Sequence, residues 1–126
     1  MSTEKRRIRE TVGLIVQLSL QTIWGDGEDD LRSTTIADAL EDLFKDSQLG
    51  VVDGTDTGGG KLNVFIFDIA DSNWDDVLNI VIKSLNEQGV LDGAVIARSI
   101  SWETDEDEWV EHEVVWPENY KNRFVI

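Results

Sequence analysis

The chain has 126 residues, of which 40% are hydrophobic and none is cysteine. This length fits one domain of common size, and the apolar fraction is typical of a folded globular protein. The absence of cysteine excludes disulfides, thiolate catalysis and cysteine-ligated zinc, and it suits a reducing compartment. We therefore expect one cytoplasmic domain that spans residues 1–126.

Charge is distributed unevenly along the chain. The formal net charge is −15, and four of the 11 basic residues lie within the first nine positions. From position 10 onward, 25 acidic residues face only 7 basic ones, a balance of −18. Such a surface repels nucleic-acid phosphates and anionic lipids, so we expect no direct binding to nucleic acid or to membranes. It attracts basic proteins, although solubility alone is the alternative explanation of the charge.

The first half of the chain predicts an arm, a strand, a loop and a helix. Residues 1–10 are expected to form a solvated basic arm; no cleavage-site pattern of a signal peptide follows it, and the next apolar run is too short to span a bilayer. Residues 11–24 alternate as in a strand, although Ile8, Val12 and Ile15 would also fit a helix face. Residues 25–30 predict a loop. A helix should run from a cap at residues 33–35 to about residue 47. Its expected buried stripe is Ile36, Leu40, Leu43 and Phe44.

The second half predicts three strands, a helix and a further strand. Residues 49–55 and 61–69 should form a hairpin with a glycine-rich connection, and the second strand is apolar on both faces, as a central strand is. Residues 71–73 can cap a helix that Gly89 ends. Residues 94–102 and 109–116 predict two strands around an acidic turn, and Pro117 closes the second strand. The helix should bury a stripe formed by Trp74, Val77, Leu78, Val81, Ile82 and Leu85.

The order of these elements is β-α-β-β-α-β, followed by an extra C-terminal strand. This order predicts an α+β fold of the ferredoxin-like, split βαβ type: an antiparallel sheet with two helices on one face. The other face must then be solvated, covered by the chain itself or bound to a partner. The apolar C-terminal residues 124–126 are expected to dock on the domain.

No catalytic or metal-binding motif withstands inspection. A phosphate-binding loop at residues 54–61 fails, because Leu62 and a strand follow Lys61. The acidic runs at residues 26–30 and 105–108 lack the spacing of a calcium-binding EF-hand loop. His112, the only histidine, is flanked by glutamates that would point to the opposite face of a strand. We expect no enzymatic activity, no cofactor and no metal; an enzyme would require a carboxylate pair in a closed pocket.

The positions of the tryptophans are more informative about function than these motifs are. Of the five tryptophans, Trp74 is expected in the core, whereas Trp102 and Trp109 flank the acidic run at residues 103–108. Packing within the sheet is one explanation. The other is an aromatic–acidic patch, in which rings anchor a partner and carboxylates accept its Arg or Lys side chains. The predicted partner-binding residues are Asp26, Glu28, Asp29, Asp30, Trp102, Asp105, Glu106, Asp107, Glu108 and Trp109.

Small size, acidity, lack of cysteine and the segments at residues 57–68 and 105–117 together resemble bacterial immunity proteins, which block cationic toxins that are often nucleases. The resemblance is one of composition and strand pattern, and it transfers no residue role. It implies a stoichiometric inhibitor that docks on a basic toxin and covers its working surface. Two alternatives remain: a regulatory domain that forms homodimers or binds a small ligand, and a DNA mimic.

Overall fold

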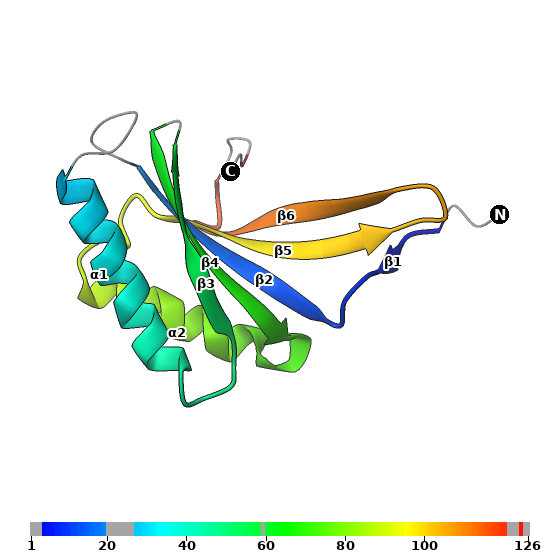
Figure 1. Ribbon diagram of the computed structural model, residues 1–126, viewed down its shortest axis with the longest axis horizontal. Helices are drawn as coiled ribbons and strands as arrows, with labels where there is room; N and C mark the ends of the chain where they lie inside the picture. Colours follow the sequence, from blue (N-terminus) through cyan, green and yellow to red (C-terminus); the bar gives the residue numbers. More distant parts are fainter. Residues whose placement is uncertain (1–3, 20–26, 59, 121–123, 125–126) are drawn as a thin grey trace.

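The computed structural model describes residues 4–19, 27–58, 60–120 and 124, with only the backbone course for residues 27–34 and 57–58. The fold is α+β, with a six-stranded antiparallel sheet and two α-helices (Figure 1). The elements in chain order are β1 (Arg6–Arg7), β2 (Thr11–Ser19), α1 (Gly27–Phe44), β3 (Val51–Gly58), β4 (Lys61–Ala70), the 3-10 turn η1 (Asp71–Asn73), α2 (Trp74–Glu87), β5 (Val95–Glu103) and β6 (Glu108–Trp116).

The strand order is β1-β5-β2-β4-β3. In addition, β6 pairs with β5 along the edge that β2 does not occupy. The helix α1 lies in the chain between β2 and β3, which flank β4, and α2 lies between β4 and β5, which flank β2. Each helical connection therefore skips one strand of the sheet. In the described part of the chain, β3 and β6 are the outer strands. The predicted central position of residues 61–69 is confirmed, because β4 has a partner on both sides.

The main core lies between the helices and one face of the sheet. Alternate residues of β2 point toward the helices, and Leu14 and Val16 at its middle have no exposed surface. Burial of such side chains stabilises the fold by about 1.5–3 kcal/mol each. From the helices, the core receives Ile36, Leu40, Phe44, Trp74, Val77, Val81 and Leu85.

The sheet face opposite the helices, here called the open face, is also largely buried at its centre. Ile15 and Gln17 of β2 are only 2% and 4% exposed. The Gln17 side chain donates a 3.0 Å hydrogen bond from Nε2 to Oδ1 of Asn63, which is buried beside it on β4. Phe124 of the C-terminal segment contacts the His112 ring on β6, with centroids 5.6 Å apart. Docking of the tail is thus confirmed at Phe124; residues 125 and 126 lie outside the described part.

A bulge shapes the open face where β2 meets β4. The register shifts between Val12 and Leu14, so that β4 has one extra residue at this point, and Asp68 adopts a positive φ of 60°. A Cβ atom on Gly13 would lie 3.2 Å from Cδ1 of Phe67. Because glycine has no side chain, the Phe67 ring can approach the β2 backbone there.

The β5–β6 hairpin projects past the end of β2, away from both helices (Figure 1). The basic N-terminal segment follows it: β1 pairs with the outer half of β5, with Arg6 opposite Glu103 and Arg7 opposite Trp102. The backbone N–H of Ile8 also donates to the Ser101 carbonyl at 3.0 Å. Residues 6–8 are therefore paired with β5, although Arg6 and Ile8 remain exposed, and residues 1–3 lie outside the described part.

Helix α1 departs from its prediction in two ways. It begins at Gly27, so residues 27–30 are helical and do not belong to a loop, and residues 33–35 lie inside the helix instead of capping it. Acidic residues in a first helical turn interact favourably with the helix dipole, which gives this early start a physical reason. Leu43, expected in the buried stripe, is 47% exposed, whereas Ile36, Leu40 and Phe44 are buried. Trp24 lies outside the described part.

Helix α2 and the strands around it follow the pattern more closely. Trp74, Val77, Val81 and Leu85 are buried, and Leu78 and Ile82 are partly buried against the same core. Gly89 has a positive φ of 74°, as expected of a residue that ends a helix. Asn73 precedes α2 but makes no side-chain capping bond, so the predicted cap is wrong. The strand β3 extends to Gly58, through part of the expected glycine-rich connection.

Candidate functional site

The free end of the β5–β6 hairpin is a tight, hydrogen-bonded turn. The Thr104 backbone N–H donates to the Asp107 carbonyl at 2.8 Å, and the Thr104 hydroxyl accepts from the N–H groups of Glu106 and Asp107 at 3.3 and 3.1 Å. Residues 105–108, called here the acidic turn, are all exposed. Because the backbone bonds are made within the turn, its consecutive carboxylates are directed into solvent.

Two tryptophans lie next to the acidic turn. Trp102 and Trp109 are directly opposite each other in the pairing of β5 with β6, which places them on the same face of the hairpin. Trp102 is partly buried, and Nζ of Lys5 lies 4.2 Å from its ring centroid, within the range of a cation–π contact. Trp109 is 38% exposed. The fold therefore brings together the C-terminal half of the predicted site, with Trp109 as the accessible ring.

Basic residues of the N-terminal segment neutralise part of the charge near the free end of this hairpin. Arg6 lies 3.1 Å from the Asp105 carboxylate and 3.9 Å from that of Glu103. Lys5 lies 4.0 Å from Glu111. Exposed pairs of this kind contribute only about 0–1 kcal/mol each to stability, but they cancel local charge. Sequence patterns gave no signal of this long-range pairing.

The uncompensated charge is consequently concentrated at the end of the acidic turn. In the described part of the chain, no ion pair is made by Glu106, Asp107 or Glu108. Asp105, by contrast, is engaged by Arg6. Of the four predicted carboxylates in this turn, three are therefore free to meet a partner's cations.

The other predicted acidic segment is not part of the same surface. Glu28, Asp29 and Asp30 lie in the first turn of α1, and Asp26 lies outside the described part. The start of α1 is at the opposite end of the molecule from the hairpin tip (Figure 1). The structure thus separates the predicted site into two acidic segments, and the hairpin one adjoins the exposed Trp109 ring.

Two ionisable groups near the hairpin have shifted pKa values. Arg7 forms a short hydrogen bond with Asp71 at the start of η1, and this bond is the main reason that the pKa of Asp71 lies below its usual value. Burial lowers the pKa of His112, so its ring is neutral at pH 7. The His112 Nδ1 atom is 2.8 Å from the Ser99 hydroxyl across the strand pair. No group of three metal-ligating side chains occurs among the described residues.

We expect the lowered pKa of His112 to make stability depend on pH. The unfolded chain takes up a proton near pH 6.5, whereas the folded chain does so only at lower pH. The stabilisation is therefore complete above about pH 6.5 and decreases as the pH falls through this window. Urea unfolding of wild type and His112→Gln from pH 7.5 to 5 should show the wild type losing stability relative to the variant. A difference that does not change with pH would contradict this expectation.

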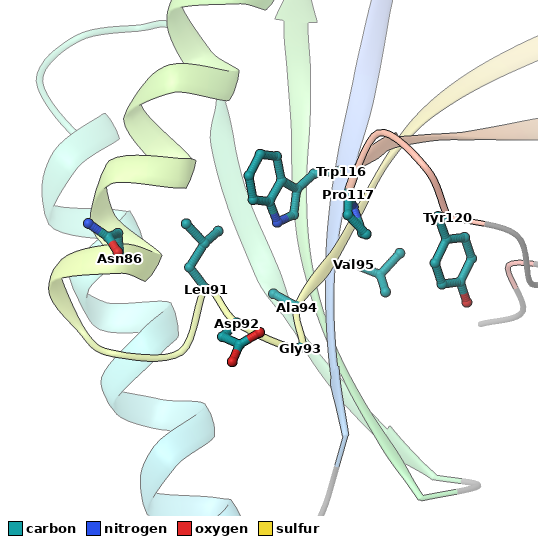
Figure 2. A pocket seen from close by; sticks show the side chains of 9 residues that line it. All are labelled: Asn86, Leu91, Asp92, Gly93, Ala94, Val95, Trp116, Pro117 and Tyr120. Carbon is teal, nitrogen blue, oxygen red and sulfur yellow. The ribbon is translucent and has the colours of Figure 1, made fainter.

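Two hollows that the sequence did not predict adjoin these elements. One, of about 480 Å³, lies between the end of α2, the turn into β5 and the end of β6. Figure 2 shows the Trp116 side chain directed toward α2 and Leu91, with Tyr120 on the other side of Pro117. The second, of about 260 Å³, is on the open face around Gly13, Phe65 and Phe67. Both are formed by segments that are far apart in the chain, so no local sequence pattern predicts them.

Comparison of the chain with known protein families, curated proteins and solved structures finds no match. Within the described residues, neither helix has the length and apolar character needed to cross a bilayer. The functional assignment consequently depends on the charge, the exposed rings and the hollows described above.

Proposed function

We propose that this chain is an acidic protein-binding module that neutralises a basic partner, and that its specific role is that of an immunity protein inhibiting a bacterial toxin. One observation carries the proposal: Glu106, Asp107 and Glu108, which form no ion pair with the described residues, stand exposed at the end of a projecting hairpin beside the accessible Trp109 ring. A cationic surface would be met first by this turn.

The two parts of the hairpin end would act at different stages of binding. Clustered like charge raises the rate of encounter with an oppositely charged protein, by about 10- to 1000-fold at low salt. An exposed tryptophan supplies the desolvated contact area that slows dissociation, and tryptophan is enriched among residues that dominate binding energy. Lys5 and Arg6 pair with Glu111 and Asp105, so that the attraction is focused on Glu106, Asp107 and Glu108.

The association rate with the partner tests this function. The candidate partner is a basic protein captured at low salt, or the product of a toxin gene beside that of this chain. The triple variant Glu106→Gln, Asp107→Asn, Glu108→Gln should slow association about tenfold or more at low ionic strength and change dissociation little. The difference should shrink at physiological salt, because screening removes long-range attraction.

A matched control removes the same charge elsewhere. Asp38, Glu41 and Asp46 are exposed carboxylates on or just after α1, far from the hairpin tip (Figure 1). Their triple replacement by Asn, Gln and Asn should alter association much less than the tip variant. Equal slowing by both triple variants would mean that only net charge matters. Association that does not respond to salt would contradict electrostatic steering altogether.

We also propose that the fold belongs to the ferredoxin-like, split βαβ type. The support is the central order β5-β2-β4-β3, together with two helical connections that each skip one strand. In this interpretation β1 and β6 are additions around β5, and they build the projecting hairpin on which the binding function depends.

The strongest observation for the alternative function, binding of a small ligand, is the hollow shown in Figure 2. Its volume of about 480 Å³ is within the usual range of ligand sites, and Trp116 and Tyr120 give it aromatic walls. A ligand retained through purification and released on denaturation, detected by mass spectrometry, would favour this alternative.

A further inference from the structure

Exposed apolar side chains are concentrated on one surface of the molecule. Among the described residues, five large hydrophobic side chains are exposed, and only Leu43, on α1, stands apart from the others. Three of the remaining four line adjoining hollows of the open face: Ile8 at 39% exposure, Val51 at 53% and Val110 at 52%. Trp109, at 38%, borders the hairpin-side hollow, but its side chain is on the face of β6 opposite to that of Val110. Grouped exposure of this kind marks an interaction surface more often than scattered exposure does.

Three hollows lie next to one another on this face, because Arg9 lines all of them. The middle hollow, of about 260 Å³, has an apolar floor of Ile15, Phe65 and Phe67. At the β3 side, a hollow of about 280 Å³ is lined by Val51, Asp53, Phe67 and Asp68. At the hairpin side, one of about 270 Å³ is lined by Ile8, Ser101, Glu108, Trp109 and Val110. This set of three hollows is called the open-face groove below.

The charges along the groove are mostly negative. Asp53 and Asp68 are exposed at the β3 end, and Glu108 is exposed at the hairpin end, against the single cation of Arg9. Between these ends the floor is apolar. Beside this floor, His112 lines the middle hollow, and its ring packs against the ring of Phe124. The groove therefore combines apolar sites with carboxylates at both ends.

We infer that the open-face groove binds an extended segment of a basic protein, with apolar side chains in the hollows and Lys or Arg side chains facing Asp53, Asp68 and Glu108. Charge complementarity selects this occupant. A second copy of this chain is disfavoured, because each copy carries a net charge of −15. The inference rests on the proposed function and extends it from the hairpin tip to the open face.

Glu108 connects the groove with the acidic turn, because it belongs to both. A basic segment drawn in by Glu106 and Asp107 would meet Val110 next, and the Phe67 end of the groove after that. In this arrangement the turn sets the rate of arrival and the groove sets the lifetime of the complex. Glu106 and Asp107 line none of the three hollows, so replacing these two residues tests the turn separately from the groove.

Two acetylated eight-residue peptides serve as probes, one alternating Lys with Leu and one alternating Lys with Ser. Titration of the isotope-labelled protein, followed by NMR, gives affinities and maps the contacts. We expect the Lys–Leu peptide to bind about tenfold tighter and to shift the amide signals of Gly13, Val51 and Val110. The Lys–Ser peptide should shift only the acidic turn.

Variants assign the apolar preference to the groove. Val51→Thr with Val110→Thr keeps the β-branched shape on two exposed strand positions, so the fold is retained. This variant should remove the preference for the Lys–Leu peptide. The control Leu43→Gln alters the remaining exposed hydrophobic residue on α1 and should keep the preference.

The outcomes separate the two proposals. Equal affinity for both peptides, or a preference that survives Val51→Thr with Val110→Thr, overturns the groove and leaves the acidic turn standing. A preference for the Lys–Leu peptide, together with affinities for both peptides that do not respond to Glu106→Gln with Asp107→Asn, supports the groove and counts against attraction by the turn. No binding of either peptide overturns both. A dimer of the free protein that the valine variant dissociates would place a second copy in the groove and overturn the inferred occupant.

Discussion

Replacing Leu40 by alanine is expected to lower the free energy of unfolding by about 2–5 kcal/mol. Leu40 on α1 has no exposed surface and belongs to the core between the helices and the sheet. Its truncation removes buried methyl groups and leaves a cavity that a densely packed core fills only in part. Because domains are stable by only about 5–15 kcal/mol, this one change should remove a large fraction of the total.

The same helix provides the control for this prediction. Leu43 is three residues away in α1 and is 47% exposed, so Leu43→Ala makes the same chemical change with little cavity formation. Its expected effect is within about 0.5 kcal/mol. Urea unfolding monitored by tryptophan fluorescence measures both variants. Similar losses for the two leucines would show that α1 is not oriented as described.

The buried polar pair on the open face should give the second large effect. Asn63→Leu removes the acceptor of the 3.0 Å bond that Nε2 of Gln17 donates, at a site where Gln17 is 4% exposed. An unsatisfied buried donor costs about 1–3 kcal/mol. We therefore expect the free energy of unfolding to fall by about this amount.

A double replacement separates the hydrogen bond from the burial of the site. When Gln17→Leu is added to Asn63→Leu, both polar groups are gone, and much of the lost stability should return. The coupling energy of the double-mutant cycle is the quantity to measure, because it isolates the pair from effects of each residue alone. Additive losses in the two single variants would contradict the expected coupling.

The sheet and α2 could be predicted from the sequence because their signals are local. Alternation identifies β2, and an apolar run on both faces identifies β4 as a central strand, which its pairing with β2 and β3 confirms. The stripe of α2 has helical spacing throughout, and Gly89 supplies the left-handed residue that ends the helix. In these segments local preference and tertiary packing favour the same structure.

The errors arose where a local pattern was ambiguous or a distant contact decided the outcome. Glycine and aspartate at residues 25–30 indicate a loop, yet the same acidic side chains are suited to a first helical turn, which α1 adopts. The docking of β1 depends on contacts between Arg6 and carboxylates almost a hundred positions later, which no window of sequence contains. Leu43 fits the spacing of the stripe but lies beyond the width of the buried face.

In the candidate site, too, the sequence predicted what depends on neighbouring residues and missed what depends on distant packing. Trp102, the acidic turn and Trp109 are neighbours in sequence, so a hairpin was enough to bring them together. The acidic residues 28–30 seemed equivalent by composition, but their position depends on where α1 packs. The open-face groove combines Arg9 with residues of five strands, so it emerges only once the strand order is known.

The outer strands of the sheet also limit which assemblies the chain can form. Asp53 and Asp56 lie on β3, and Glu111 and Glu113 lie on β6. If two copies joined along either strand, carboxylates would be brought near one another, and such pairing is unfavourable. Amyloid-type stacking is thereby disfavoured at its first step. In the proposed role of a one-to-one inhibitor, the chain would have to accumulate in excess over its partner, and this arrangement would keep its own sheet from becoming a template for aggregation.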